Sequence, residues 1–200
     1  MGGAARAVSE GSADRPAALS AWPELSREEP FIFVTVGTDH HLFDRLMRWV
    51  DNWAGEPEGP RLIVQSGTSS PPERVPSRPY LDYEDMCAAI DGSIGVVCQG
   101  GPATIMEVRR TGRIPIVVPR RASLGEHVND HQWLFSKRLA KESQIDLCET
   151  EDELRESIRR LIEDPASFRF EHGDQEHVSD AVAAFAALVD PLIAERRSRR

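Results

Sequence analysis

The stretch 31–38, with the sequence FIFVTVGT, decides the fold class. Its first six residues are aromatic or β-branched and do not alternate between polar and apolar, which is typical of a strand buried on both faces of a sheet. Gly37 and Thr38 end this strand, and apolar residues at helical spacing follow between Leu42 and Trp53. The pattern predicts a strand, a tight loop and a helix, which is the repeating unit of a parallel α/β sheet.

The alternation of strands and helices continues along the chain. Further strands are predicted at 62–65, 93–98, 114–118 and 145–147, and helices at 84–90, 103–111, 126–141 and 151–163. The segment 66–79 is rich in Gly, Ser and Pro and is predicted to be a long loop. Successive βαβ units are right-handed, so the fold class is α/β, a Rossmann-like parallel sheet with helices on both faces.

Three regions of different composition define the expected domain organisation. Residues 1–29 combine Ala, Gly, Ser, Pro and charge without a period, and we expect a disordered leader there. Residues 30–165 form the predicted Rossmann-like domain. Residues 166–200 are interpreted as a linker and an amphipathic helix over 180–196 with a basic tip.

Composition excludes several function classes. The net charge of −9 argues against a general nucleic-acid-binding protein, which needs a basic face. Three widely spaced cysteines, Cys87, Cys98 and Cys148, form neither a disulfide framework nor a zinc pattern. The longest apolar run, 181–189, is about half of what a bilayer span requires. With no secretory signal pattern either, we expect a cytoplasmic protein with reduced thiols.

Two loops at predicted strand ends have the composition of a phosphate site. In parallel sheets ligands bind at the carboxyl ends of the strands. Gly37 and Thr38 follow the first strand, and Gly100 and Gly101 follow the strand that ends near Gln99. The second pair precedes a helix, and the first-turn amides of that helix, from Ala103 and Thr104, are suited to a diphosphate. Glu107 lies one turn further on, where it could bind ribose hydroxyls or pair with Arg110 or Arg121.

A third loop, 119–132, is dense in groups that bind hydroxyls and phosphates. His127 and His131 are four residues apart, so on the predicted helix they share a face and could suggest a metal site. The pattern is not H-E-x-x-H, and Asp130 lies off that face. We therefore predict a hydrogen-bonding sugar site and no metal.

These motifs together resemble the C-terminal domain of family 28 glycosyltransferases. Gly101, Thr104 and Glu107 fit its G-x-x-[ST]-x-x-E nucleotide-sugar signature, and 125–132 (GEHVNDHQ) is similar to the G-E-H-V-D-D-H-Q segment of one branch. That branch, whose F-V-T-V-G-T start also resembles 33–38, comprises PssE-like soluble subunits of split glycosyltransferases of bacterial exopolysaccharide synthesis, which are related to the catalytic subunit of the dolichol-linked GlcNAc transferase. The resemblance covers about residues 31–161.

The resemblance implies the C-terminal half of a GT-B glycosyltransferase, which binds the UDP-sugar donor. Under it, Glu107 binds ribose, Gln132 with His131 or Asp130 contacts the sugar, and Gly37 faces the phosphates or the acceptor. The branch usually has His where this chain has Gln99, and Gln cannot carry a positive charge toward the diphosphate. The implied UDP-sugar site comprises Gly37, Thr38, Gln99, Gly100, Gly101, Ala103, Thr104, Glu107, Arg120, Glu126, His127, Asp130, His131 and Gln132.

The resemblance also implies a partner. One Rossmann-like domain lacks the acceptor half of a GT-B enzyme, so a membrane-anchored, acceptor-binding glycosyltransferase subunit would supply the lipid-linked saccharide acceptor and the general base. The chain would be peripheral at the inner membrane face through that partner and would need no cofactor besides its donor substrate. Two alternatives stay open: a non-catalytic activator of a glycosyltransferase partner, which Gln99 favours, and an unrelated flavodoxin-like nucleotide-binding protein.

Overall fold

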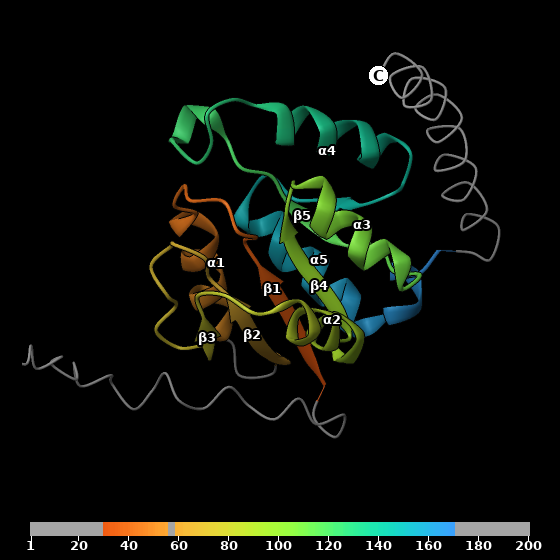
Figure 1. Ribbon diagram of the computed structural model, residues 1–200. Coiled ribbons are helices and arrows are strands. Elements are labelled where there is room, and N and C mark those ends of the chain that lie inside the picture. The colour runs from red at the N-terminus through yellow and green to blue at the C-terminus, as the bar shows by residue number, and fades with distance from the viewer. Residues whose placement is uncertain (1–29, 56–58, 171–200) are drawn as a thin grey trace, which may run out of the picture.

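The computed structural model describes residues 30–55 and 59–170 (Figure 1). Within these residues all the strands pair in parallel in one sheet with the order β3-β2-β1-β4-β5-β6. The strands are β1 (Phe31–Thr35), β2 (Arg61–Gln65), β3 (Ser77–Arg78), β4 (Gly95–Gln99), β5 (Ile116–Val118) and β6 (Asp146–Leu147). The α-helices are α1 (Asp44–Ala54), α2 (Tyr83–Gly92), α3 (Pro102–Arg110), α4 (His131–Lys141) and α5 (Glu151–Glu163). The predicted α/β class with a Rossmann-like parallel sheet is confirmed.

Strand β1 lies at the centre of the sheet. It pairs with β2 on one side, with Thr35 opposite Gln65, and with β4 on the other, with Thr35 opposite Cys98. All five of its residues are buried. A strand with neighbours on both edges and helices on both faces has no solvent-exposed side, which is why its sequence is a continuous apolar run.

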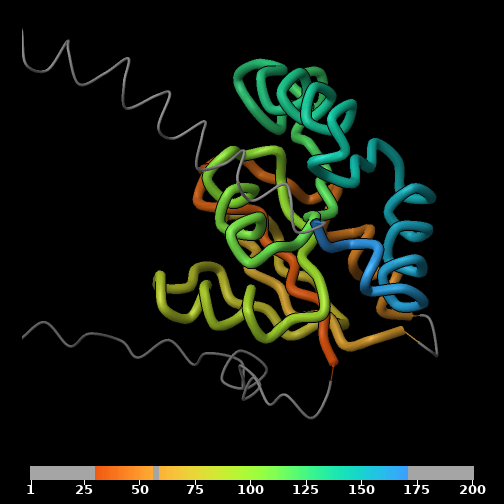
Figure 2. The backbone as a smooth tube through the Cα atoms, turned by 90° about the vertical axis from the view of Figure 1, so that its right-hand side faces the viewer, coloured from red at the N-terminus to blue at the C-terminus, as the bar shows by residue number. Residues whose placement is uncertain are grey.

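Helices cover both faces of the sheet (Figures 1 and 2). On one face the apolar side chains of α1 and α5 pack against β1 and β2, with Phe168 of the short 3-10 helix Pro165–Phe168 in the same cluster. On the other face α2, α3 and α4 pack against β1, β4 and β5. Figure 1 shows α4 beyond the carboxyl ends of the strands. None of the helices that the structure describes has the length and apolar character needed to cross a bilayer.

The start of α4 differs from the prediction. The helix begins at His131, whereas the sequence pattern predicted a start at 126. Gly125 has a φ of 70°, and the Glu126 carboxylate accepts the backbone N–H of Arg121. Asp130 accepts the N–H of Ala122 in the same way. These side-chain-to-backbone bonds replace the helical ones, a competition typical of acidic and amide side chains near helix starts.

The predicted loop over 66–79 contains one further element. Ser77–Arg78 forms β3, which extends the sheet beside β2, with Val64 opposite Ser77. A two-residue strand carries no periodicity that a sequence reading can detect. The expected leader 1–29 and the final helix 180–196 lie outside the described residues.

The sheet order places the functional edge of the domain. The chain winds from β1 outward to β3, returns to β4 beside β1, and then winds outward in the other direction. The connections on the two sides of the β1–β4 boundary diverge, and in open α/β sheets ligands bind at the carboxyl ends of the strands at such a switch point, a region that we call the crevice. A flavodoxin-like sheet has the different order 2-1-3-4-5.

Candidate functional site

Three segments meet at this crevice: the β1 loop (residues 36–43), the glycine turn (99–102) and the β5 loop (119–130). Arg120 joins all three. Its Nε donates to Gln99 Oε1 at 2.8 Å, while its two Nη atoms donate to the carbonyl oxygens of Val36 (3.1 Å), His41 (2.7 Å) and Glu126 (3.1 Å). The crevice is therefore organised around one guanidinium.

The Arg120 side chain has no exposed surface. Its guanidinium also lies over the Phe43 ring, 4.7 Å from the ring centre. Burial lowers the pKa of Arg120, and the nearby carboxylates of Asp39 and Glu126 oppose this effect. Because its N–H groups are directed at protein oxygens, Arg120 positions the loops in this structure, and its contact with the UDP-sugar stays a prediction.

Close neighbours leave little room for a side chain at three glycine positions, two of them beside Gln99 and one beside Ser136. A Cβ on Gly37, whose φ is 72°, would lie 2.1 Å from Gln99 Nε2, and one on Gly101 would lie 3.1 Å from the same atom. A Cβ on Gly100 would lie 2.7 Å from Ser136 Oγ. Only glycine, which lacks a Cβ, permits this approach. The close contacts that the sequence suggested for a ligand are thus made in part by the protein's own side chains.

The N-terminus of α3 faces the same edge with free donors. Its N-cap residue Gly101 makes no side-chain cap, its first residue is Pro102, and it has no acidic residue in the first turn. Ala103 is exposed and Thr104 partly exposed, so their amides and the positive end of the helix dipole are available to an anion. The binding of a diphosphate by these amides stays a prediction.

Glu107 lies one turn along α3 and is paired. Its Oε1 accepts from Arg110 Nη1 at 2.8 Å. The Glu107 side chain is 24% exposed and that of Arg110 is 65% exposed. A partner this exposed holds a carboxylate weakly, so the pair leaves Glu107 accessible to another donor.

Gln132 closes the crevice from α4. Its Nε2 donates to Gln99 Oε1 at 3.3 Å. Its Oε1 is buried and, among the residues that the structure describes, has no hydrogen-bond partner. A buried unpaired acceptor is unfavourable, and a ligand hydroxyl would satisfy it. His131, the first residue of α4, is exposed beside it, and Asp130 is occupied by the Ala122 amide.

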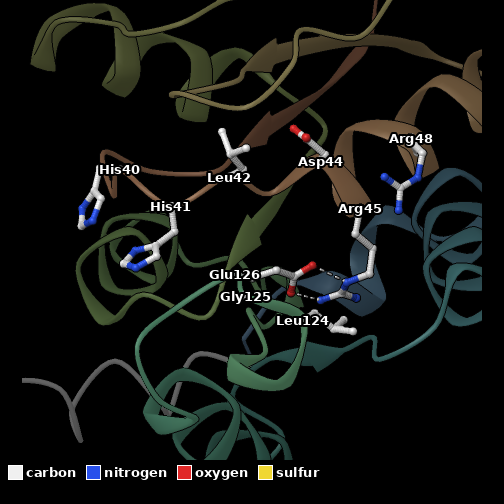
Figure 3. A pocket seen from close by; sticks show the side chains of 9 residues that line it. All are labelled: His40, His41, Leu42, Asp44, Arg45, Arg48, Leu124, Gly125 and Glu126. Carbon is white, nitrogen blue, oxygen red and sulfur yellow. Dashed lines mark hydrogen bonds and ion pairs between the residues drawn. The ribbon is translucent and has the colours of Figure 1, made fainter.

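Glu126 forms an ion pair with Arg45 beside the crevice, and this pair was not predicted from the sequence. Arg45 Nε and Nη2 donate to its two carboxylate oxygens at 2.8 Å each (Figure 3). This bidentate pair joins α1 to the β5 loop and lines a cavity of about 630 Å³ together with His40, His41 and Arg48. Arg45 and Arg48 are three residues apart on α1, a spacing that gives a shared face but no functional motif.

The β1 loop carries a compact group of histidines. Asp39 Oδ1 accepts from the backbone N–H of His41 at 2.8 Å and lies 2.6 Å from His41 Nδ1. His127 of the β5 loop approaches the other oxygen, Asp39 Oδ2, with its Nε2 at 3.5 Å. Burial raises the pKa of Asp39, but the two hydrogen bonds from His41 and the charge of Arg120 outweigh it, so this pKa lies below its ordinary value.

The expected shared helical face of His127 and His131 is not formed. The two residues were expected on one helical face, but His127 precedes the helix and contacts Asp39, whereas His131 is the first helical residue. The remaining predicted residues, Thr38 among them, stay predictions, since no ligand contact tests them.

The fold and the crevice define the class of protein: a Rossmann-like domain equivalent to the C-terminal half of a GT-B glycosyltransferase. The sequence matches the glycosyltransferase family 28 C-terminal domain over residues 31–187. The chain therefore belongs to this family, and the resemblance to the family is confirmed, while the PssE-like branch stays a prediction. The alternative of an unrelated flavodoxin-like protein is wrong, in keeping with the observed sheet order. No curated protein matches the chain.

Solved structures share the fold. MurG of Acinetobacter baumannii is 19% identical, with a TM-score of 0.51 over 70% of this chain and 43% of MurG. The glycotransferase of kitacinnamycin is 20% identical, with a TM-score of 0.50 over 82% of this chain and 40% of the other. The chain thus spans less than half the length of either protein.

Proposed function

We propose that this chain is the donor-binding, catalytic subunit of a two-component glycosyltransferase. It would bind a UDP-sugar at the crevice, and a membrane-anchored partner would supply a lipid-linked saccharide acceptor. The observation that carries the proposal is the uncapped N-terminus of α3 beside the unpaired Gln132 Oε1, at the carboxyl ends of β1 and β4. A sugar diphosphate requires N–H donors for its phosphate oxygens and, near them, an acceptor for a sugar hydroxyl.

The residues divide the task between them. The amides of Ala103 and Thr104 would hold the diphosphate and stabilise the charge that develops on it as the bond to the sugar breaks. Glu107 would accept the ribose hydroxyls. Gln132 would fix the sugar, because its Oε1 accepts a hydroxyl while its Nε2 stays on Gln99. Helix dipoles and amides supply the electrostatic stabilisation, so the proposal includes no metal in the transfer step.

The proposal assigns the acceptor side of the reaction to a partner. The chain spans 43% of MurG and 40% of the kitacinnamycin glycotransferase. We propose that the partner carries the acceptor site and the general base. The chain would then work at the cytoplasmic membrane face through its partner. The activator alternative differs in one respect, since an activator would not bind UDP by itself.

Isothermal titration of the full chain with UDP, and with ADP as a comparison, tests the proposal. Glu107→Ala should weaken UDP binding by about 10- to 150-fold, since hydrogen bonds to a charged group contribute about 1.5–3 kcal/mol. Arg110→Ala is the matched control, because it removes the ion pair but leaves the carboxylate. UDP binding that is unaffected by Glu107→Ala, or equally affected by Arg110→Ala, would contradict the ribose role.

Two further outcomes separate the alternatives. A folded chain that binds neither nucleotide would favour the activator. Equal affinity for UDP and ADP would contradict a uridine-specific donor site. Gln132→Leu should leave UDP affinity nearly unchanged and weaken UDP-sugar affinity, because the side chain is assigned to the sugar alone.

A further inference from the structure

Four potential metal ligands gather beside the crevice: Asp39, His40 and His41 of the β1 loop, and His127 of the β5 loop. The ligand atoms of the first three lie within 4.8 Å of one another. His127 lies outside that group but near it, with its Nε2 3.5 Å from the second carboxylate oxygen, Asp39 Oδ2, so a small side-chain movement would add a fourth ligand. We propose that this cluster, the histidine cluster, binds one divalent transition-metal ion, with Zn²⁺ as the best match. The inference goes beyond the proposed function and does not depend on it.

The donor set selects the class of ion. Three imidazoles and one carboxylate suit Zn²⁺, Ni²⁺ or Co²⁺, whereas Mg²⁺ and Ca²⁺ require mainly oxygen ligands. Zinc sites are tetrahedral with bonds of about 2.0–2.2 Å, which places neighbouring ligand atoms about 3.3 Å apart. The 3.5 Å between His127 Nε2 and Asp39 Oδ2 already fits that spacing. The 2.6 Å contact between His41 Nδ1 and Asp39 Oδ1 is a hydrogen bond, and an ion that replaces its proton would widen it to the same value.

Three of the four side chains in the cluster are largely buried, and His40 is exposed. The side chains of Asp39, His41 and His127 are only 20–23% exposed. The imidazole ring centres of His40 and His41 lie 4.1 Å apart, and those of His41 and His127 lie 5.6 Å apart. The backbone beneath is held in place, since buried Arg120 donates to the carbonyl of His41.

An ion bound at the histidine cluster would connect two loops. Figure 3 shows the rings of His40 and His41 side by side at one end of the cavity, away from the Arg45–Glu126 pair. Because three ligands come from the β1 loop and His127 comes from the β5 loop, the ion would tie together two of the three segments that frame the crevice. It would also place positive charge at that end of the cavity.

Calorimetric titration of the tag-free, chelator-treated full chain with Zn²⁺ tests this site. We expect saturable binding of one ion per chain. Titration with Co²⁺ should give the intense visible absorption of a tetrahedral ion, without the charge-transfer band of a thiolate ligand. His41→Ala and His127→Ala should each weaken Zn²⁺ binding by at least about tenfold, since even the loss of a group supporting a ligand has an effect of that size.

Matched variants keep the test specific. His131→Ala removes an exposed histidine outside the cluster and should leave the affinity unchanged. A double His172→Ala, His177→Ala variant removes the two histidines outside the described residues and should do the same. Asp39→Asn keeps the side-chain size and should weaken Zn²⁺ binding as the histidine variants do, with urea unfolding confirming that each variant is folded.

Three results would overturn the proposal. The first is that the chain shows no saturable Zn²⁺ binding. The second is that the Zn²⁺ affinity is unchanged in both His41→Ala and His127→Ala. The third is that Zn²⁺ affinity is lost only in the His172→Ala, His177→Ala variant.

Discussion

Replacing Arg120 by methionine should destabilise the whole domain. Methionine keeps most of the apolar length of the side chain but removes the guanidinium. The carbonyl oxygens of Val36, His41 and Glu126, now bonded at 2.7–3.1 Å, would then lose the Arg120 donor. Gln99 Oε1 would lose its 2.8 Å bond from Arg120 and keep only the 3.3 Å bond from Gln132 Nε2. The stacking on Phe43 would be lost as well.

The size of the effect follows from these contacts. Leaving one buried acceptor unsatisfied costs about 1–3 kcal/mol, and such terms do not add fully because water reaches some of the groups. Breaking a buried charged network by removing one member typically costs about 3–5 kcal/mol. We therefore expect Arg120→Met to lower the free energy of unfolding by about 3 kcal/mol or more, a large part of the roughly 5–15 kcal/mol of a typical domain.

Urea unfolding of the full chain, followed by tryptophan fluorescence and far-UV circular dichroism, measures this change. Arg121→Met is the matched control, because the neighbouring arginine is one-third exposed and its ion pair with Glu149 has a length of 3.2 Å. Pairs of this kind contribute about 0–1 kcal/mol. Arg120→Lys should fall between the two, since an ammonium cannot reach acceptors on opposite sides of a planar fork. A loss for Arg120→Met within about 1 kcal/mol of the control would refute the reasoning.

Two further predictions concern packing and thiol chemistry. Gly37→Ala, with a φ of 72° and a Cβ 2.1 Å from the Gln99 carboxamide, should lose clearly more stability in urea than Gly125→Ala, which has a φ of 70° and no atom within 4 Å. The free energy of unfolding of Gly125→Ala should fall by only about 1 kcal/mol, the cost of a left-handed backbone conformation for alanine. Equal losses in the two variants would contradict the close approach of Gln99 to Gly37. Burial raises the pKa of Cys98 and of Cys148 to about 12, so both stay protonated and unreactive at about pH 8. A disulfide reagent should label one thiol per folded chain and three in denaturant, and a second fast thiol in the folded chain would show that one of these cysteines is accessible.

Sequence reasoning succeeded where local pattern governs structure. Strand β1 was predicted from its apolar run, and α5 was predicted at its observed bounds of Glu151–Glu163. The helix is marked by a capping box, in which Thr150 and Glu153 satisfy each other's backbone amides. The α/β class follows from the alternation of such elements, and the family from motifs at three strand ends.

The prediction of α4 shows where the local sequence pattern fails to predict the structure. Residues 126–141 were predicted as one helix, yet Glu126 lies outside it. Its carboxylate pairs with Arg45, which lies 81 positions earlier in the chain. Gly125 in the left-handed region completes the break. A contact over that separation depends on the sheet order, and no window of sequence contains it.

The same division holds for the site. The sequence by itself determined the strand ends, the glycine turn and the helix start that follows it, because these lie within short stretches whose periodicity and turn chemistry act locally. Gln132 was singled out by the family resemblance, and its contact with the sugar stays a prediction. Only the tertiary structure decided that Gln99 fills the space above Gly37 and that Arg120 joins three loops. It also decided that His127 contacts Asp39 and does not share a helical face with His131. The physical reason is topology: a parallel sheet with a switch point brings the carboxyl ends of strands distant in sequence to one edge, and the side chains there choose partners by proximity in space.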